Sequence, residues 1–141
     1  MSSCDRSSTD SGVMNRLYAF AAMLLLAACS SVTPPEERAM QAAQESYDHL
    51  LAGRYEQFLA GRAFADSLPD NYREQLLVAY KQFMHQQEAA HGAIQRAEAV
   101  RARIDTTLQL VQVFFVLNYA DSTQEEIVVP MIEQDGQWKM K

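Results

Sequence analysis

The sequence contains few of the residues that disulfides, thiolate metal sites and phosphate-binding loops require. Its 141 residues include only two cysteines, Cys4 and Cys29, and five glycines. No thiol follows Cys29, which excludes a disulfide framework, a thiolate metal site and a cysteine nucleophile from the rest of the chain. Glycine-rich phosphate loops and the G-x-S-x-G motif are also missing. A folded domain must therefore derive its stability from a hydrophobic core.

Clusters of positive charge are missing as well. The formal net charge is −6, and the basic residues are scattered along the chain. Nucleic acid is thereby excluded as a partner, because binding it requires a positive patch that displaces counterions. Hydrophobic residues make up 48% and charged residues 21% of the sequence, which is typical of a globular protein. The length leaves room for one domain.

One apolar run stands apart from the rest of the sequence. It extends from Leu17 to Ala28, directly after Arg16, and is too short to span a bilayer, which takes about 20 apolar residues. An export signal needs an apolar segment of roughly 7 to 15 residues, which this run matches. Residues 1–13 are polar, and Met14 would make a conventional start, so we expect translation to begin there.

The end of this run identifies a modification site. Leu26-Ala27-Ala28-Cys29 resembles the lipobox of bacterial lipoproteins, in which a peptidase cleaves before a cysteine whose thiol becomes the lipid attachment point. The resemblance implies a signal peptide over residues 1–28, followed by a lipidated Cys29 and a short tether over residues 29–35. Ser30 stands where an aspartate retains many lipoproteins at the inner membrane, so we expect an anchor in the outer membrane.

Helical patterns fill the first half of the remaining chain. Thr33 is expected to cap a helix that begins with two prolines and ends at Gly53. A short helix is predicted from Arg54 to Ala60, and a longer one from Asp70 to Ala90, where apolar residues recur at steps of three and four. Gly92 then ends the helical part.

Strand patterns follow Gly92, because β-branched and aromatic residues become frequent and turn residues separate them. In the second predicted strand, alternate residues from Val111 to Tyr119 share one face, while Phe114 and Val116 lie on the other. Such a strand is either covered on both sides or affected by a bulge. A turn over Gln134, Asp135 and Gly136 is expected before the last strand. The four predicted strands are 93–104, 107–120, 123–133 and 137–141.

This order of elements resembles the nuclear-transport-factor-2-like (cystatin-like) superfamily, and within it lipoprotein domains of uncharacterised function. The resemblance implies an α+β domain over residues 36–141, in which three helices pack on a curved four-stranded antiparallel sheet that forms a cone. Some relatives use the interior of the cone as an active site, and others use it as a binding cleft. The matching residues are Tyr119, Asp121, Glu125, Val129, Asp135, Gly136, Trp138 and Lys139.

Titratable residues form no convincing catalytic or metal-binding pattern. Asp48 and His49 are neighbours on the first helix, but adjacent helical residues point in different directions. His85 and His91 are six residues apart, about 120 degrees around a helix of roughly 3.6 residues per turn, whereas metal-binding histidines on one helix favour a spacing of four. We therefore expect no catalytic residue, no metal and no cofactor.

The aromatic residues suggest a pocket instead. Most of them fall on the predicted inward faces, and we expect Tyr47, Tyr80, Phe115 and Trp138 to line any cavity that the cone retains. The sequence thus predicts a non-enzymatic, lipid-anchored envelope protein that binds a small apolar ligand or an envelope protein. The alternatives are an isomerase-like or hydrolase-like cone enzyme, and a scaffold or assembly lipoprotein that forms a homodimer through its sheet face.

Overall fold

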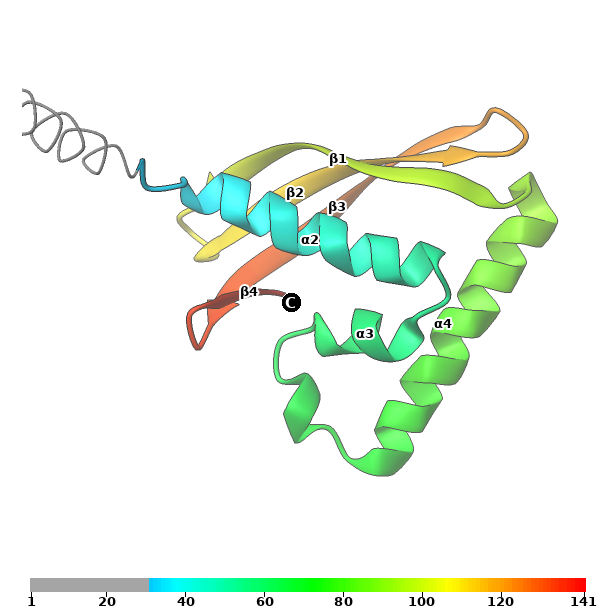
Figure 1. Ribbon diagram of the computed structural model, residues 1–141, viewed down its shortest axis with the longest axis horizontal. Helices are drawn as coiled ribbons and strands as arrows, with labels where there is room; N and C mark the ends of the chain where they lie inside the picture. Colours follow the sequence, from blue (N-terminus) through cyan, green and yellow to red (C-terminus); the bar gives the residue numbers. More distant parts are fainter. Residues whose placement is uncertain (1–30) are drawn as a thin grey trace, which may run out of the picture. The chain divides into compact units, whose positions relative to one another are not determined.

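Three helices precede four strands along the chain, in the order that the sequence predicts (Figure 1). The computed structural model describes residues 31–141, so the lipobox lies outside the described residues. Among the residues described, no helix combines the length and apolarity needed to cross a membrane. The elements are α2 (Pro35–Leu51), α3 (Tyr55–Ala60), the short 3-10 helix η2 (Ala65–Ser67), α4 (Asp70–His91), β1 (Ile94–Asp105), β2 (Leu110–Tyr119), β3 (Gln124–Gln134) and β4 (Gln137–Met140).

Helix α2 begins at a proline pair. Pro34 is the N-cap and Pro35 occupies the first turn, so the predicted cap at Thr33 is wrong by one residue, and no side chain caps the helix. Proline fits the first turn because its missing N–H has no partner there in any case. Two glutamates in the first turn complement the positive end of the helix dipole. The helix ends at Leu51, just before Gly53 with φ +74°.

The four strands form an antiparallel meander in the order β1-β2-β3-β4. The last hairpin turns at Asp135 and Gly136, as the sequence predicts, and both have positive φ angles of 51° and 77°. Two consecutive positive φ angles are typical of the tight turn that matches strand twist. On its other side, β4 pairs with the loop after α3, where the Ala63 amide donates to the Met140 carbonyl at 2.7 Å.

Strand β2 supplies the centre of the core. The inward face alternates as predicted, and Val113 and Phe115 are both 0% exposed. The bulge that was one alternative for β2 is absent from that strand, because the register shifts lie in the neighbouring strand β1, between Ile94 and Arg96 and between Ala99 and Arg101. On the outer face, the guanidinium of Arg101 lies 3.8 Å from the ring centroid of Phe114. A single long side chain therefore gives β2 part of the second cover that its sequence suggests.

Helix α2 packs closely on β1 through small side chains. Ala39 and Ala43 are 0% exposed and belong to the same buried cluster as Ala97 of β1. Beside them, the Gln44 amide bonds to the β1 backbone: Nε2 donates to the Ala97 carbonyl at 2.9 Å, and Oε1 accepts from the Ala99 amide at 2.9 Å. Because β1 is at one edge of the sheet, Gln44 bonds to backbone groups that no strand pairs with.

Helix α4 packs much less tightly. None of its 22 residues is buried, although Tyr80 and Met84 are partly buried against the core. Figure 1 shows α4 running from the η2 turn to the beginning of β1, with α3 beside it. The apolar pattern correctly predicts a helix here, but the helix leaves hollows on both sides. One of these hollows, which Tyr80 borders, is the first candidate site described next.

Candidate functional site

Three aromatic residues, one from each helix, meet on the inner side of the sheet. The rings of Tyr47 and Phe58 are 5.7 Å apart, and those of Phe58 and Tyr80 are 4.9 Å apart, both pairs edge to face. The Tyr47 ring also lies 4.5 Å from that of Phe115. Edge-to-face and offset ring pairs at such distances stabilise a fixed arrangement. We call the hollow that they border, together with Arg62 of the following loop, the aromatic cradle.

The aromatic cradle has a volume of about 230 Å³. Its lining is mostly aromatic and aliphatic, and it contains no aspartate, glutamate, histidine, serine or cysteine. Phe115 is fully buried beneath Tyr47 and does not reach the hollow. Of the four residues that the sequence analysis proposed for a pocket, Tyr47 and Tyr80 therefore line this hollow. The lining residues are Tyr47, Phe58, Arg62, Tyr80, Val128, Val129, Pro130, Met140 and Lys141.

Arg62 and Lys141 both bring positive charge to the aromatic cradle. The Nη1 atom of Arg62 lies 3.4 Å from the Tyr80 hydroxyl, and within residues 31–141 no carboxylate lies within 4.0 Å of its guanidinium. An arginine remains protonated at any pH at which the protein is folded. Burial raises the pKa of Tyr47 to about 12, so its hydroxyl is neutral at physiological pH. The aromatic cradle therefore combines apolar walls with cations and the neutral Tyr47 hydroxyl.

Trp138 lines a different hollow, between α2, the end of α3 and β4. This groove, which we call the Trp138 groove, has a volume of about 570 Å³ and shares no lining residue with the aromatic cradle. Gly61 forms part of its wall, and a β-carbon at this position would approach the Ser46 hydroxyl within 2.4 Å. Glycine is thus needed for α2 and the loop after α3 to approach each other.

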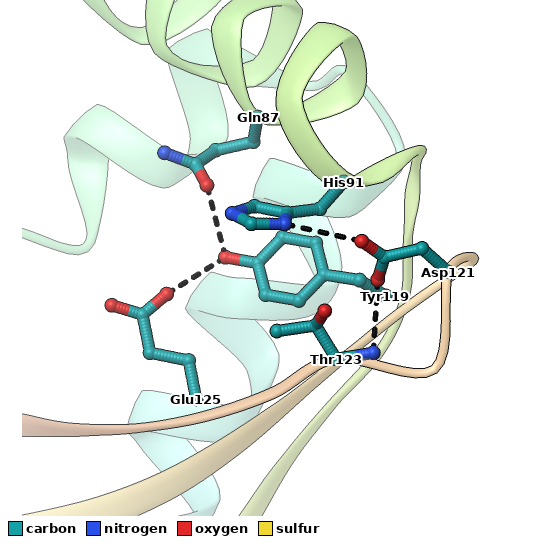
Figure 2. A network of polar contacts seen from close by, with 6 residues as sticks. All are labelled: Gln87, His91, Tyr119, Asp121, Thr123 and Glu125. Carbon is teal, nitrogen blue, oxygen red and sulfur yellow. Dashed lines mark hydrogen bonds and ion pairs between the residues drawn. The ribbon is translucent and has the colours of Figure 1, made fainter.

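A polar cluster joins the end of α4 to the β2–β3 hairpin (Figure 2). The Tyr119 hydroxyl donates to Glu125 Oε2 at 2.8 Å and lies 3.1 Å from Oε1 of Gln87. Tyr119 is only 2% exposed. Burial, followed by the hydrogen bond to Glu125 and its charge, raises the pKa of Tyr119 to about 12. Its hydroxyl is therefore protonated at neutral pH and engaged with α4 and β3.

His91 and Asp121 form the outer part of this cluster. His91 Nδ1 lies 3.2 Å from Asp121 Oδ2, and both side chains are 42% exposed. Hydrogen bonds from the side chain and the backbone of Thr123, together with nearby His91, lower the pKa of Asp121. Ser122, which stands between Asp121 and Thr123 in the sequence, has a φ of 71°, a conformation that favours glycine. Because Asp121 already accepts a hydrogen bond from the Thr123 amide at 2.9 Å, we interpret the His91–Asp121 pair as a contact that stabilises the turn.

The other titratable candidates lie apart from both hollows or are already hydrogen-bonded. Asp48 is exposed and accepts a hydrogen bond from Gln44 at 2.9 Å, while His49 Nδ1 accepts from Arg54 at 2.9 Å. His85 lines a broader hollow of about 870 Å³ between α4 and the end of α2. Among the residues that the structure describes, no three acidic, histidine or cysteine side chains are placed to hold a metal ion.

Two features of these sites could not be found from sequence patterns. Arg62 follows α3 in a loop, and only the parallel bridge to Met140 brings it beside the aromatic cradle. His91 and Asp121 are 30 residues apart and meet because α4 ends where the β2–β3 hairpin turns. A helix pattern predicts neither contact, since both depend on how α4 is placed relative to the sheet. The modification residues Leu26, Ala27, Ala28 and Cys29 lie outside the described residues.

Comparison with known proteins supports the fold alone. No protein-family model and no curated protein matches the sequence. Among solved structures, the chain resembles a protein from Campylobacter jejuni that carries the provisional name NTF2-like transpeptidase, with a TM-score of 0.53 and 11% sequence identity. The match covers 70% of this chain and 92% of that protein. The domain therefore has the nuclear-transport-factor-2-like fold, with three helices packed on an open four-stranded antiparallel sheet, as the sequence resemblance implied.

Proposed function

We propose that the protein is a lipid-anchored component of the bacterial cell envelope whose domain binds a ligand without transforming it. The single observation that carries the binding role is the composition of the aromatic cradle. Its walls provide tyrosine hydroxyls, aromatic rings and an arginine without an ion-pair partner in the described part of the chain. They provide no general base or nucleophile suited to neutral pH, since Tyr47 ionises only near pH 12.

The proposed ligand is a small apolar molecule, or the end of a longer one, with an anionic group. The volume of about 230 Å³ lies below the usual range of about 300–1,000 Å³ for drug-sized ligands. Aromatic and aliphatic walls favour an apolar body, and the Arg62 guanidinium favours a carboxylate. Medium-chain carboxylates such as hexanoate match this combination of size and charge.

Binding can be tested by calorimetry with hexanoate and with hexanamide, its neutral analogue. We expect hexanoate to bind and hexanamide to bind about tenfold or more weakly, because a charge-assisted hydrogen bond to arginine is lost. Arg62→Gln should reduce hexanoate affinity to the same degree. Arg103→Gln, at an exposed position on β1, is the matched control and should leave affinity unchanged. Equal affinity for both probes, or no binding of either, would contradict the proposal.

The envelope anchor is supported by the sequence alone and needs its own test. Cells that express the protein can be grown with an alkyne analogue of palmitate, and the protein can then be examined for the label. We expect labelling of the wild type and none of Cys29→Ala, which should also leave the membrane fraction. A single acyl chain binds membranes only reversibly, so stable sedimentation requires further chains. An unlabelled wild type would contradict the anchor but not the ligand site.

The provisional name of the C. jejuni protein does not transfer to the aromatic cradle. Acyl transfer requires a nucleophile, and no serine, threonine or cysteine lines this hollow. No cysteine at all follows Cys29 in the sequence. The proposed role therefore remains binding.

A further inference from the structure

The Trp138 groove is a second hollow, independent of the aromatic cradle, and its walls differ in chemistry. One stripe of α2 forms one side, and α3 with β4 forms the other. The side-chain amides of Gln41, Gln57 and Gln137 border it, and none of them makes a hydrogen bond within residues 31–141. Each amide can both donate and accept.

Charged side chains of both signs border the groove, with two cations against one carboxylate. Arg38 and Glu45, both on α2, contribute one charge of each sign. Lys139 of β4 adds a second cation, and its ammonium donates to the Ala60 carbonyl at 3.0 Å. A ligand held mainly by these walls should therefore be rich in hydrogen-bonding groups.

Trp138 adds an aromatic wall with an unmet hydrogen-bond donor. Its indole nitrogen is the one buried side-chain polar atom in the described part of the chain without a partner. Because this atom is buried, an occupant of the groove contacts other atoms of Trp138. An indole also offers a flat apolar surface on which the apolar face of a sugar ring can pack.

From these observations we infer that the Trp138 groove binds a glycan that carries acetamido groups. The apolar face of a sugar ring packs on Trp138, and an acetamido group pairs with the glutamine amides through both its N–H and its C=O. At about 570 Å³, the groove lies within the range of about 300–1,000 Å³ that is common for ligand clefts. The known fold does not imply this ligand, because fold and function are only loosely related.

The chain offers a direct probe of this groove, since Trp138 is its only tryptophan. Intrinsic fluorescence should therefore change saturably when chitotetraose, a tetramer of N-acetylglucosamine, is added. Maltotetraose has the same length but no acetamido groups, and we expect it to bind at least tenfold more weakly. Absence of a saturable change with millimolar chitotetraose, or equal affinity for the two sugars, would overturn the inference.

Variants locate the binding within the groove. Gln41→Ala and Gln57→Ala should each weaken chitotetraose affinity about three- to tenfold, the usual effect of losing one hydrogen bond. Gln82→Ala changes an exposed glutamine on α4, which does not line the groove, and should leave affinity unchanged. Circular dichroism should show that all three variants fold. If they fold and the two groove variants bind chitotetraose as tightly as the control, the sugar binds elsewhere and the inference is wrong.

Discussion

Helices α2 and α4 look alike in the sequence but are embedded to very different degrees. Both show apolar residues at helical spacing, yet α2 buries four of its 17 residues, spread along its length, whereas α4 buries none of its 22. The buried positions of α2 include Ala39 and Ala43, whose small side chains allow close approach to the sheet. Helical periodicity therefore identifies a helix, but side-chain size and the space beside the helix decide how deeply it is buried.

The two helices are also held in place by different contacts. α2 is held against β1 by buried alanines and by Gln44, whereas α4 is held mainly by Tyr80, Met84 and the polar cluster at its end. Elements with few buried apolar contacts open at low free-energy cost, and binding sites often use such elements. The following four substitutions test this comparison, in order of decreasing effect.

The largest expected effect is the loss of a buried leucine from α2. Leu50 is 4% exposed, and Leu50→Ala should lower the free energy of unfolding by about 2–5 kcal/mol, because it leaves a cavity in the core. Val78 on α4 is 56% exposed, so Val78→Ala should change the free energy of unfolding by no more than about 0.5 kcal/mol. Urea unfolding of both variants measures the difference. Similar losses at the two positions would show that α4 is as deeply packed as α2.

The second effect depends on pH and concerns the stability that Tyr47, a residue of α2, contributes. Because the pKa of Tyr47 is raised from 10.0 to about 12 in the folded protein, its contribution to stability is complete below pH 10 and is lost between pH 10 and 12. Tyr47→Phe removes this ionisation, so over that range the variant should lose roughly 2–3 kcal/mol less than the wild type. Tyr72→Phe, at an exposed position on α4, should decline as the wild type does. Unfolding curves at several alkaline pH values provide the measurement.

Overfilling the contact between α2 and β1 should have a smaller effect. Ala43 is 0% exposed, and Ala43→Leu should destabilise the domain by about 1–3 kcal/mol because the added methylenes push the helix from the sheet. Ala79 of α4 is exposed, so Ala79→Leu should remain within about 0.5 kcal/mol of the wild type. Thermal unfolding would distinguish these outcomes. If Ala43→Leu is neutral, α2 does not depend on small residues for its position.

The smallest effect is expected at the β2–β3 turn, where Asp121 contacts His91 at the end of α4. The pKa of Asp121 is lowered from 3.8, so the stability that it contributes is present above that pH and is lost as the pH falls below it. Asp121→Asn should therefore reduce stability slightly at pH 7 and flatten the decline in acid below about pH 4. Asp66→Asn, at an exposed position in η2, should keep the decline of the wild type. Acid titrations followed by circular dichroism would measure how the stability of the wild type and of both variants declines.

Most of the fold can be predicted from sequence because its signals are local. The proline pair before α2, the glycine after α4 and the Asp135-Gly136 turn each set an element boundary through backbone preferences. The inward face of β2 follows from strict alternation. The register shifts of β1 could not be predicted, because their position depends on strand pairing.

The candidate sites were less accessible to sequence reasoning. Aromatic spacing suggested Tyr47 and Tyr80 as pocket residues, and both line the aromatic cradle. It could not show that Trp138 lies in another groove, or that Phe115 is covered by Tyr47. These outcomes depend on the position of β4 relative to α2 and on ring packing, which no periodicity encodes.

The Gln44 amide has a consequence for how copies of this protein meet. A bare strand edge invites the backbone of a second chain, and this is a common beginning of aggregates. Here one side chain mimics the partner by presenting its own N–H and C=O to Ala97 and Ala99, so an incoming strand finds these groups already taken. The proposed anchor would concentrate many copies in the plane of a membrane. There, the bonds from Gln44 would keep neighbouring domains from pairing through this part of β1.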